Sequence, residues 1–431
     1  MNSRMYLLYS LALALVTIIS FPWWGLQMLR LGKYRAGLRE RLGIVPARLR
    51  AEAQPGSIWI HAVSVGEVLA VGQLVTELQQ MSPDTRVFVS TTTAAGQKLA
   101  RERFGEARVF YLPLDFGFAI RSYLRLLQPR LLILAETELW PNLLHLAKKS
   151  GASVAIVNAR ISDRSFPRYR RFQRLFAGVL SEVDLFLAQT EEDRARLLSI
   201  GARTGGVQVS GNLKFDIRLS PDSPLVEDLR RVIAKDFPVL VCGSTTDGEE
   251  DLLLSAFQQV LAQYPLAVMV LAPRRPERFD QVADLIAEKG MSYVRRTSWD
   301  GSPLAGKVFL LDSVGELAAV YALAHVAFVG GSLFPVGGHN ILEPAQHGVA
   351  VVTGPHTFNF REIVRIFEEG GALTVATPET LAPKLLDLVQ TPERRIVQGQ
   401  RASALFHRHT GATRRTLEAL RPFLNHSARP R

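Results

Sequence analysis

The chain of 431 residues contains a single cysteine, Cys242, and this scarcity excludes internal disulfide bonds. Cys242 lies in the apolar run VLVCGS, which is typical of a buried strand. We therefore interpret it as a buried thiol rather than a nucleophile. A chain without disulfide bonds fits a reducing compartment.

Several catalytic motifs are also missing. The nine histidines include no HExxH pair and no GxSxG occurs, so metalloprotease and serine hydrolase functions have no support. The first predicted strand is not followed by GxGxxG, which argues against a nicotinamide enzyme. The formal charge is +11, but the basic residues are dispersed and no nucleic-acid motif accompanies them. We expect a membrane surface or acidic substrates as partners, and no nucleic acid.

Charged residues are absent between Arg4 and Arg30, and this window is about as long as a bilayer's hydrocarbon core requires. Trp23 and Trp24 suit a membrane interface. Basic residues follow directly, at Arg30, Lys33, Arg35, Arg39 and Arg41. We predict an N-terminal membrane anchor over residues 1–29, with the rest of the chain on the cytoplasmic side of the membrane.

A cleaved signal peptide is the alternative to an anchor. It is less favoured because the basic cluster lies on the wrong side and no small-x-small site ends the run. Ser20 and Pro22 leave open whether the anchor spans the bilayer or lies in its interface.

After the anchor, short apolar strands alternate with amphipathic helices such as Ala94–Phe104 and Phe116–Leu127, which indicates a doubly wound parallel α/β sheet. The first set of predicted strands is Ile58–His61, Val87–Ser90, Val109–Tyr111, Leu131–Ala135, Val154–Asn158, Leu185–Gln189 and Val207–Ser210. The second set is Val239–Cys242, Ala267–Leu271, Val308–Leu311, Val326–Val329 and Val349–Val352.

A polar interval with two prolines, around Ser220–Pro224, separates the two sets and reads as a linker. We predict two Rossmann-like domains facing a cleft, one over residues 30–219 and the other over residues 220–431. The last helix could pack back on the first domain. Ligands in such sheets bind at the carboxyl ends of the strands.

The stretch Gly330–Phe360 combines a strand, a glycine-rich turn, a helix and another strand. Gly337 and Gly338 would let the backbone approach a ligand closely, and Asn340 would open a helix whose free N–H groups attract phosphate. Glu343 could then accept hydrogen bonds from sugar hydroxyls. The alternative is a plain glycine-rich connection with a capped helix.

Glu67 follows the first predicted strand, in the segment WIHAVSVGEVLA, and lies in the first turn of a helix. A carboxylate there could take a proton from an attacking hydroxyl. The alternative is a capping box between Ser64 and Glu67, which have the required spacing.

Glu136 and Glu138 follow another buried strand in LAETELWPN. The spacing allows a weak metal site, but helix N-terminal charge ahead of Pro141 is the better interpretation because no histidine or third acid is close in sequence. Lys214 in GNLKFD could neutralise anionic charge, although a solvated lysine is the usual alternative.

Two further segments could contact a phosphate or a nucleotide. Arg274 and Arg275 in LAPRRPERF directly follow a strand, and arginine can bind phosphate bidentately. A basic helix start is the alternative, but cations are unfavourable at that end of a helix. Ser313 and Glu316 bound a second turn, which could equally be a capping box.

Together, these segments resemble the 3-deoxy-D-manno-octulosonic acid (Kdo) transferases of Gram-negative bacteria. The motifs that carry the resemblance are HAVSVGE, TTTAAG, ETELWPN, NARISDRS, GNLKFD, PRRPERF, DSVGEL, GGHNILEP and GPHTFNF. The resemblance implies the GT-B architecture, a CMP-Kdo donor, a lipid A precursor (lipid IVA) as acceptor and an inverting mechanism in lipopolysaccharide synthesis. It implies that residues 30–219 form the acceptor domain and residues 220–431 the CMP-sugar donor domain, and that the enzyme works at the cytoplasmic face of the inner membrane. It implies no cofactor and no metal site.

The resemblance also implies roles for individual residues. Glu67 matches the proton acceptor, and Glu136 and Lys214 match groups that stabilise the transition state. The positions that match contacts to CMP are Pro273, Arg274, Val314, Gly315, Glu316, Asn340, Ile341, Leu342 and Glu343.

Two other functions remain open from the sequence. One is another GT-B enzyme, such as a nucleotide-sugar epimerase or a lipid-disaccharide synthase. The other is a membrane-tethered protein that binds sugar nucleotides without catalysing a reaction. This hypothesis predicts no role for Glu67.

Overall fold

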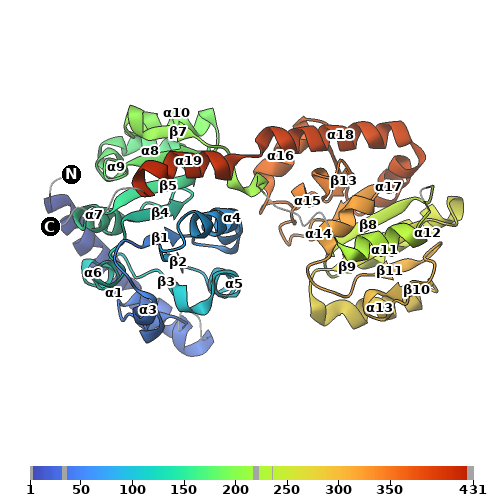
Figure 1. Ribbon diagram of the computed structural model, residues 1–431, viewed down its shortest axis with the longest axis horizontal. Helices are drawn as coiled ribbons and strands as arrows, with labels where there is room; N and C mark the ends of the chain where they lie inside the picture. Colours follow the sequence, from blue (N-terminus) through green and yellow to red (C-terminus); the bar gives the residue numbers. More distant parts are fainter. Residues whose placement is uncertain (1–2, 32–35, 217–222, 235, 425–431) are drawn as a thin grey trace. The chain divides into compact units, whose positions relative to one another are not determined.

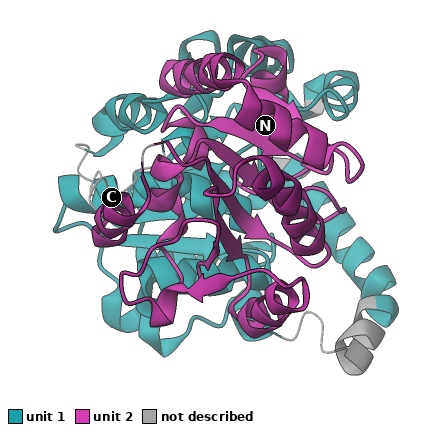
Figure 2. Ribbon diagram, turned by 90° about the vertical axis from the view of Figure 1, so that its right-hand side faces the viewer, with its two compact units in different colours: residues 1–216, 410–431 teal, residues 217–409 magenta. Residues whose placement is uncertain are grey.

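The computed structural model describes residues 3–31, 36–216, 223–234 and 236–424 (Figure 1). It divides into two compact units: unit 1 comprises residues 1–216 and 410–431, and unit 2 comprises residues 217–409 (Figure 2). We predicted the division after residue 219. Most of the predicted linker around Ser220–Pro224, and the basic residues Lys33 and Arg35, lie outside the described residues.

Unit 1 contains a parallel sheet of seven strands in the order β3-β2-β1-β4-β5-β6-β7. The strands are β1 (Ile58–His61), β2 (Val87–Thr91), β3 (Val109–Tyr111), β4 (Leu131–Ala135), β5 (Ser153–Ala159), β6 (Leu185–Ala188) and β7 (Val207–Val209). All seven were predicted to within one or two residues. The strand order reverses direction between β1 and β4, so the ends of these two strands form the sheet's switch point.

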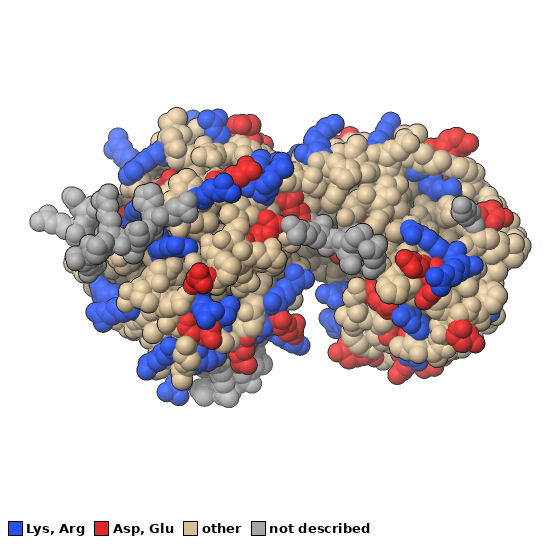
Figure 3. Space-filling view, in the orientation of Figure 1, with Lys and Arg blue, Asp and Glu red and all other residues tan. Residues whose placement is uncertain are grey.

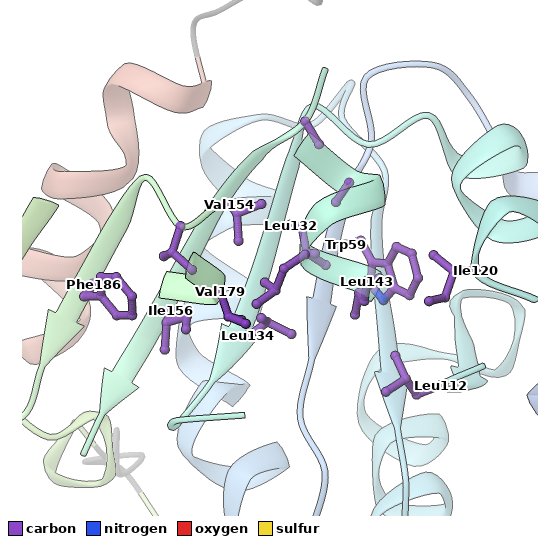
Figure 4. Packing of buried hydrophobic residues seen from close by; sticks show 14 of the residues in the cluster. Trp59, Leu112, Ile120, Leu132, Leu134, Leu143, Val154, Ile156, Val179 and Phe186 are labelled. Carbon is purple, nitrogen blue, oxygen red and sulfur yellow. The ribbon is translucent and has the colours of Figure 1, made fainter. Parts of the chain in front are cut away.

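Helices cover both faces of this sheet, because alternate side chains of each strand point to opposite faces. Trp59 and Leu132 pack on the face covered by α6 (Gly117–Leu127), α7 (Pro141–Lys149) and α9 (Gln173–Leu180) (Figure 4). Ile58 and Ile60 pack on the other face, against α4 (Val65–Met81), α5 (Ala94–Phe104) and α19 (Ala412–Leu424). Both faces are apolar, which explains the uniformly apolar strands.

The last helix, α19, belongs to unit 1. Its leucines Leu417, Leu420 and Leu424 lie in the same buried cluster as α4. The chain leaves unit 1 at Asp216, whose carboxylate accepts hydrogen bonds from the N–H groups of Gly411 (2.6 Å) and Thr413 where the chain returns.

Unit 1 is completed by its N-terminal helices and by short connecting helices. They are α1 (Ser3–Leu31), α2 (Leu38–Arg41), α3 (Ala47–Glu52), η1 (Glu106–Arg108), α8 (Phe166–Arg171), α10 (Glu191–Ser199), η2 (Thr204–Gly206) and η3 (Leu213–Phe215). Within α1, the segment Met5–Trp23 is long and apolar enough to cross a membrane, by length and composition, and nearly all of it is exposed. It is a candidate anchor.

Unit 2 contains a second parallel sheet of seven strands, in the order β10-β11-β9-β8-β12-β13-β14. The strands are β8 (Val239–Thr245), β9 (Val268–Pro273), β10 (Tyr293–Arg295), β11 (Val308–Leu310), β12 (Val326–Val329), β13 (Ala350–Thr353) and β14 (Leu373–Val375). The five central strands were predicted. Both edge strands, β10 and β14, were missed.

The helices of unit 2 surround this sheet. They are α11 (Pro224–Val232), α12 (Glu249–Gln263), η4 (Pro276–Arg278), α13 (Phe279–Glu288), η5 (Arg296–Ser298), α14 (Leu317–Val320), η6 (Tyr321–Leu323), α15 (Leu342–Ala345), α16 (Arg361–Glu369), α17 (Leu381–Gln390) and α18 (Pro392–His409). Cys242 of β8 is buried in the core formed with α12, α13 and α17, as predicted, and burial raises the pKa of its thiol.

Charges of both signs are spread over the surface. On the face drawn in Figure 3, lysine and arginine side chains are interspersed with aspartate and glutamate side chains. This agrees with the dispersed basic residues of the sequence.

Candidate functional site

Glu67 lies in the first turn of α4 and is only 8% exposed. Its carboxylate accepts a hydrogen bond from the Val63 N–H (2.7 Å) and one from the Ser64 hydroxyl (3.0 Å). A capping box requires the Ser64 hydroxyl to accept from a helix N–H, and the structure shows no such bond. Glu67 fixes the turn after β1, but it does so without the predicted capping box.

Burial raises the pKa of Glu67 to about 7. The Val63 and Ser64 hydrogen bonds oppose this rise, while the negative charges of Glu136 and Glu138 add to it. A carboxylate whose pKa lies near neutral pH is suited to accept a proton and release it again.

Glu136 reaches the same edge of the sheet because β4 is the neighbour of β1 at the switch point. It follows β4 directly and adopts a left-handed conformation (φ 55°), in which its N–H donates to the carbonyl of Val157. Its carboxylate lies 3.2 Å from Arg160 Nε and 3.6 Å from Lys214 Nζ. Glu136 therefore forms ion pairs with two cationic side chains, and its own charge acts on Glu67.

Lys214 is held in position by two asparagines. The Asn212 side chain accepts from the Lys214 N–H, and the buried Asn158 side chain accepts from the Leu213 N–H, both at 3.0 Å. Asn158 is the second-last residue of β5 and has a left-handed conformation, and its side-chain amide donor has no hydrogen-bond partner among the described residues. Asn158 and Arg160 were not predicted as site residues, although their segment NARISDRS directly follows a strand.

Glu138 is partly buried, and its pKa is raised by burial and then by the charge of Glu136. Within the described part of the chain, no group of three or more histidine, cysteine or acidic side chains is arranged to hold a metal ion. The cations beside Glu136 come from the protein itself, through Arg160 and Lys214.

In unit 2, the buried carboxylate of Glu249 organises the switch point between β8 and β12. It accepts hydrogen bonds from the backbone N–H groups of Gly331 (2.7 Å), Ser332 (2.9 Å) and Leu333 (2.9 Å) after β12. It also accepts from the N–H and hydroxyl of Thr246 after β8. Sequence reasoning missed Glu249, because no motif links it to a loop that lies 82 to 84 residues further along the chain.

The segment from Asn340 to Glu343 differs from its prediction. α15 begins at Leu342 and contains four residues, so Asn340 does not open a helix. Instead, the Asn340 side chain accepts from the Leu342 N–H (3.2 Å) and donates to Glu343 (3.3 Å). The helix that follows has only four residues, so its dipole adds little to the attraction of a phosphate, and the anion contact of this turn stays a prediction.

Gly337 and Gly338 both have positive φ angles. A Cβ atom at Gly337 would lie 2.2 Å from the side chain of Asn359, and one at Gly338 would lie 3.1 Å from the backbone of Thr357. These glycines let the turn approach the GPHTFNF segment of the protein itself. Their predicted role in ligand approach is untested.

Arg274 follows β9, and its N–H donates to the carbonyl of Thr245 (2.9 Å). Its side chain is exposed, and the short helix η4 begins two residues further on, at Pro276, directly ahead of α13. The pKa of His339 is lowered to about 4, mainly by burial and in addition by the charge of Arg274. Arg274 also opposes the burial that raises the pKa of Glu343.

These effects of its charge indicate that Arg274 lies close to the Asn340–Glu343 turn. Two of the segments predicted to bind the donor are therefore neighbours in the structure. Pro273 ends β9 and is buried, as are Ile341 and Leu342.

The turn from Ser313 to Glu316 is open to solvent. Val314 is 80% exposed and Gly315 has a positive φ angle. The Ser313 hydroxyl donates to Glu316, whose carboxylate also lies 3.1 Å from Arg296. α14 begins after Glu316, so the alternative of a capping box is wrong.

The comparisons with known proteins agree with this arrangement. Residues 36–217 match the family described as 3-Deoxy-D-manno-octulosonic-acid transferase (kdotransferase). A 3-deoxy-D-manno-octulosonic acid transferase of Haemophilus influenzae is 36% identical over 404 residues, which cover 93% of this chain and 94% of the relative. The enzyme of the same name from Bordetella pertussis is 36% identical over 429 residues, covering 96% and 99%.

Solved structures share the fold. MurG of Acinetobacter baumannii is similar with a TM-score of 0.55 at 14% identity, over 86% of this chain and 100% of that chain. UDP-GlcNAc 2-epimerase of Neisseria meningitidis reaches 0.53 at 13% identity, over 85% and 100%. These similarities confirm the predicted α/β architecture of two Rossmann-like domains. At 36% identity over nearly its whole length, the chain belongs to the 3-deoxy-D-manno-octulosonic acid transferase family of glycosyltransferases.

Proposed function

We propose that the chain transfers Kdo from CMP-Kdo to a lipid A precursor (lipid IVA), with inversion at the anomeric carbon. The observation that carries this proposal is the buried carboxylate of Glu67, with a pKa raised to about 7, beside Glu136 and its two cations. The relatives from Haemophilus influenzae and Bordetella pertussis support the sugar that is transferred.

In the proposed reaction, Glu67 takes the proton of an acceptor hydroxyl. The hydroxyl oxygen forms a bond to the anomeric carbon of Kdo, and the bond from that carbon to the CMP phosphate oxygen breaks. The electron pair of that bond leaves with CMP. Glu136 and Lys214 stabilise the charges that develop in the transition state.

Unit 2 is proposed to bind the donor. Arg274 supplies positive charge to the CMP phosphate, and its proximity to Glu343 and His339 supports this role. The proposed contacts are Pro273, Arg274, Val314, Gly315, Glu316, Asn340, Ile341, Leu342 and Glu343. The exposed turn at Val314 and Gly315 is open to a ligand.

The acceptor is a lipid, so we propose that α1 anchors the enzyme at the cytoplasmic face of the inner membrane. The apolar segment Met5–Trp23 supports this location. An anchor confines the enzyme and its lipid substrate to one surface.

Product analysis by mass spectrometry tests the function. The full chain is incubated with CMP-Kdo and a tetraacylated lipid A precursor, and the acceptor should gain the mass of Kdo. UDP-sugars in place of CMP-Kdo serve as the control. Turnover of a UDP-sugar without Kdo transfer would contradict the proposal, and CMP binding without any turnover would indicate a binder instead.

A further inference from the structure

The first two turns of α1 are held on unit 1 by polar side chains. The Tyr6 hydroxyl donates to Glu182 (2.7 Å), and the Tyr6 ring stacks on His145 with 4.0 Å between centroids. His145 Nδ1 lies 3.0 Å from the same Glu182 oxygen. Of the α1 side chains that the structure describes, only Tyr6 belongs to the buried core.

A second group of contacts lies one turn further along α1. The Tyr9 hydroxyl bonds to the carboxylate of Asp115, and the Asn142 amide donates to the Ser10 hydroxyl (3.0 Å). Asp115 is itself held by the N–H groups of Asn142 (3.1 Å) and Leu143 (2.9 Å). These contacts join the start of α1 to α7 and to the loop before α6. Figure 1 labels all three helices in unit 1.

The other end of α1 is tied to the same unit through the chain. Five residues separate Leu31 from Gly37, and a stretch of that length reaches about 20 Å at most. Gly37 is fixed against the ring of Tyr111, since a Cβ at Gly37 would lie 1.9 Å from that ring. A spanning helix must place its two ends on opposite sides of a hydrocarbon core about 30 Å thick.

The outer side of α1 is apolar and exposed. Its exposed residues are Leu7, Leu8, Leu11, Leu15, Val16, Ile18, Ile19, Phe21 and Trp23. A helix on the surface of a soluble protein rarely exposes so many apolar side chains in succession, so we expect an apolar partner such as lipid to cover them.

Unit 1 adds exposed apolar side chains beside Asp115, the contact of Tyr9. Phe118 of α6 is 61% exposed and stacks on Phe116, with 5.7 Å between centroids. Leu42 and Ile44 flank Gly43, which packs against Ala119 of the same helix. Leu114 is also exposed, and its N–H donates to the carbonyl of Arg41 (2.8 Å). We call Leu42, Ile44, Leu114 and Phe118 the α6 patch.

We infer that α1 does not cross the bilayer but lies along unit 1 at the membrane surface, with both ends on the side of unit 1. α1 and the α6 patch together form one face that contacts lipid. The inference rests on the membrane association in the proposed function and specifies its geometry. Tyr6, Tyr9 and Ser10 would otherwise have to leave their polar partners for hydrocarbon, at a cost in free energy.

Labelling of a cysteine at the start of α1 tests the topology. In a Cys242→Ser background, Ser3→Cys and the exposed Ser162→Cys of unit 1 are introduced separately into the full chain. Sealed vesicles with unit 1 facing outward are treated with a membrane-impermeant maleimide. We expect both cysteines to react in intact vesicles, at similar extents.

Reaction of Ser3→Cys only after the vesicles are opened would overturn the inference and leave the proposed catalysis and location intact. A full chain that does not bind vesicles would contradict the proposed location as well. Either result is independent of Kdo transfer, which is assayed separately.

Crosslinking tests the docking itself. In membranes, Tyr6→Cys combined with His145→Cys should form a disulfide upon mild oxidation, because the two rings stack. Leu8→Cys with His145→Cys is the matched control, since Leu8 is exposed. Equal crosslinking of both pairs would contradict docking. The absence of crosslinking in both pairs, together with a Ser3→Cys that does not react with the maleimide in intact vesicles, would contradict it as well.

A fluorophore reports on the α6 patch. Phe118→Cys and the equally exposed Phe358→Cys of unit 2 are labelled in the full chain and bound to vesicles with a quencher on the lipid tails. We expect several-fold stronger quenching at position 118. Equal quenching at both positions would remove the α6 patch from the lipid-contact face.

Discussion

Lys214 Nζ lies 3.6 Å from Glu136 Oε1, although their strands, β7 and β4, are separated in the sheet by β5 and β6. Lys214 reaches Glu136 because it lies in η3, which packs against α4. The hydrogen bond from the Leu213 N–H to the Asn158 side chain holds η3 in this position. The negative charge of Glu136 is therefore balanced, while its neighbour Glu67 remains without a cation in its described contacts.

Replacement of Glu67 tests the proton acceptor. Glu67→Gln keeps the size and an oxygen for the Val63 N–H, so the fold and CMP affinity should stay near wild type. Turnover should fall by roughly 10²–10⁴-fold, the usual range for a general base. Ser64→Ala, which removes only a hydrogen bond to Glu67, is the control and should lose far less. Normal turnover of Glu67→Gln would assign the base to another residue.

The pH dependence of kcat/KM provides a second test. Because burial raises the pKa of Glu67 to about 7, the group is protonated and inactive below that pH. The rate should fall tenfold per pH unit on the acid side of about pH 7. Glu136→Gln removes a charge that raises this pKa, so the residual activity should show an acid limb at lower pH. An acid limb that stays in place would exclude Glu67 as the titrating group.

The same shift predicts a change in stability. The folded pKa of Glu67 lies above its unfolded value of 4.5, so its favourable contribution is complete below pH 4.5 and is lost as pH rises through 7. At pH 8, Glu67→Gln should raise the free energy of unfolding of unit 1 by up to about 3 kcal/mol. The gain should shrink to less than about 1 kcal/mol at pH 5 in denaturant titrations. Equal stability at both pH values would show that the pKa is not raised.

Replacement of Arg274 tests the donor site. Arg274→Ala should weaken CMP binding by about 1.5–3 kcal/mol, as expected when a hydrogen bond to a charged group is lost. Arg275→Ala is the matched control, because both side chains are exposed and adjacent. Calorimetry should show a loss of affinity only for the first variant. Unchanged affinity would remove Arg274 from the donor site.

Glu249 should determine the stability of unit 2. Glu249→Gln replaces a buried acceptor of four backbone N–H groups with a side chain that has only one oxygen. We expect a loss of about 2–4 kcal/mol in thermal or denaturant unfolding, because a buried donor is left unpaired. Asp251→Asn in the same helix removes only an exposed ion pair with Lys289 and should cost less than about 1 kcal/mol. Similar losses in both variants would contradict this role.

The central strands of both sheets were predicted because they are buried on both faces and read as apolar runs. β10 and β14 were missed because they lie at the edges, span three residues each and are only partly buried. Their side chains lack a pattern that distinguishes a short edge strand from a loop.

The site residues were found where a carboxylate or an arginine directly follows a strand, as for Glu67, Glu136 and Arg274. The errors concern helix starts. Ser64, Asn340 and Ser313 have the residue types of helix caps, but their side chains bond to residues two or three positions further along the chain without forming the expected caps. The partners of Glu249 were beyond sequence reasoning, because their contact exists only once β8 and β12 pair.

The return of the chain at Asp216 has a consequence for synthesis on the ribosome. Unit 2 is contiguous, so it can complete its fold as soon as His409 has emerged. Unit 1 starts first but finishes after unit 2, because the leucines of α19 that cover α4 follow unit 2 in the sequence. Until then, the apolar surface of α4 is exposed in the nascent chain. We expect a chain truncated before residue 410 to fold in unit 2 and to aggregate through unit 1.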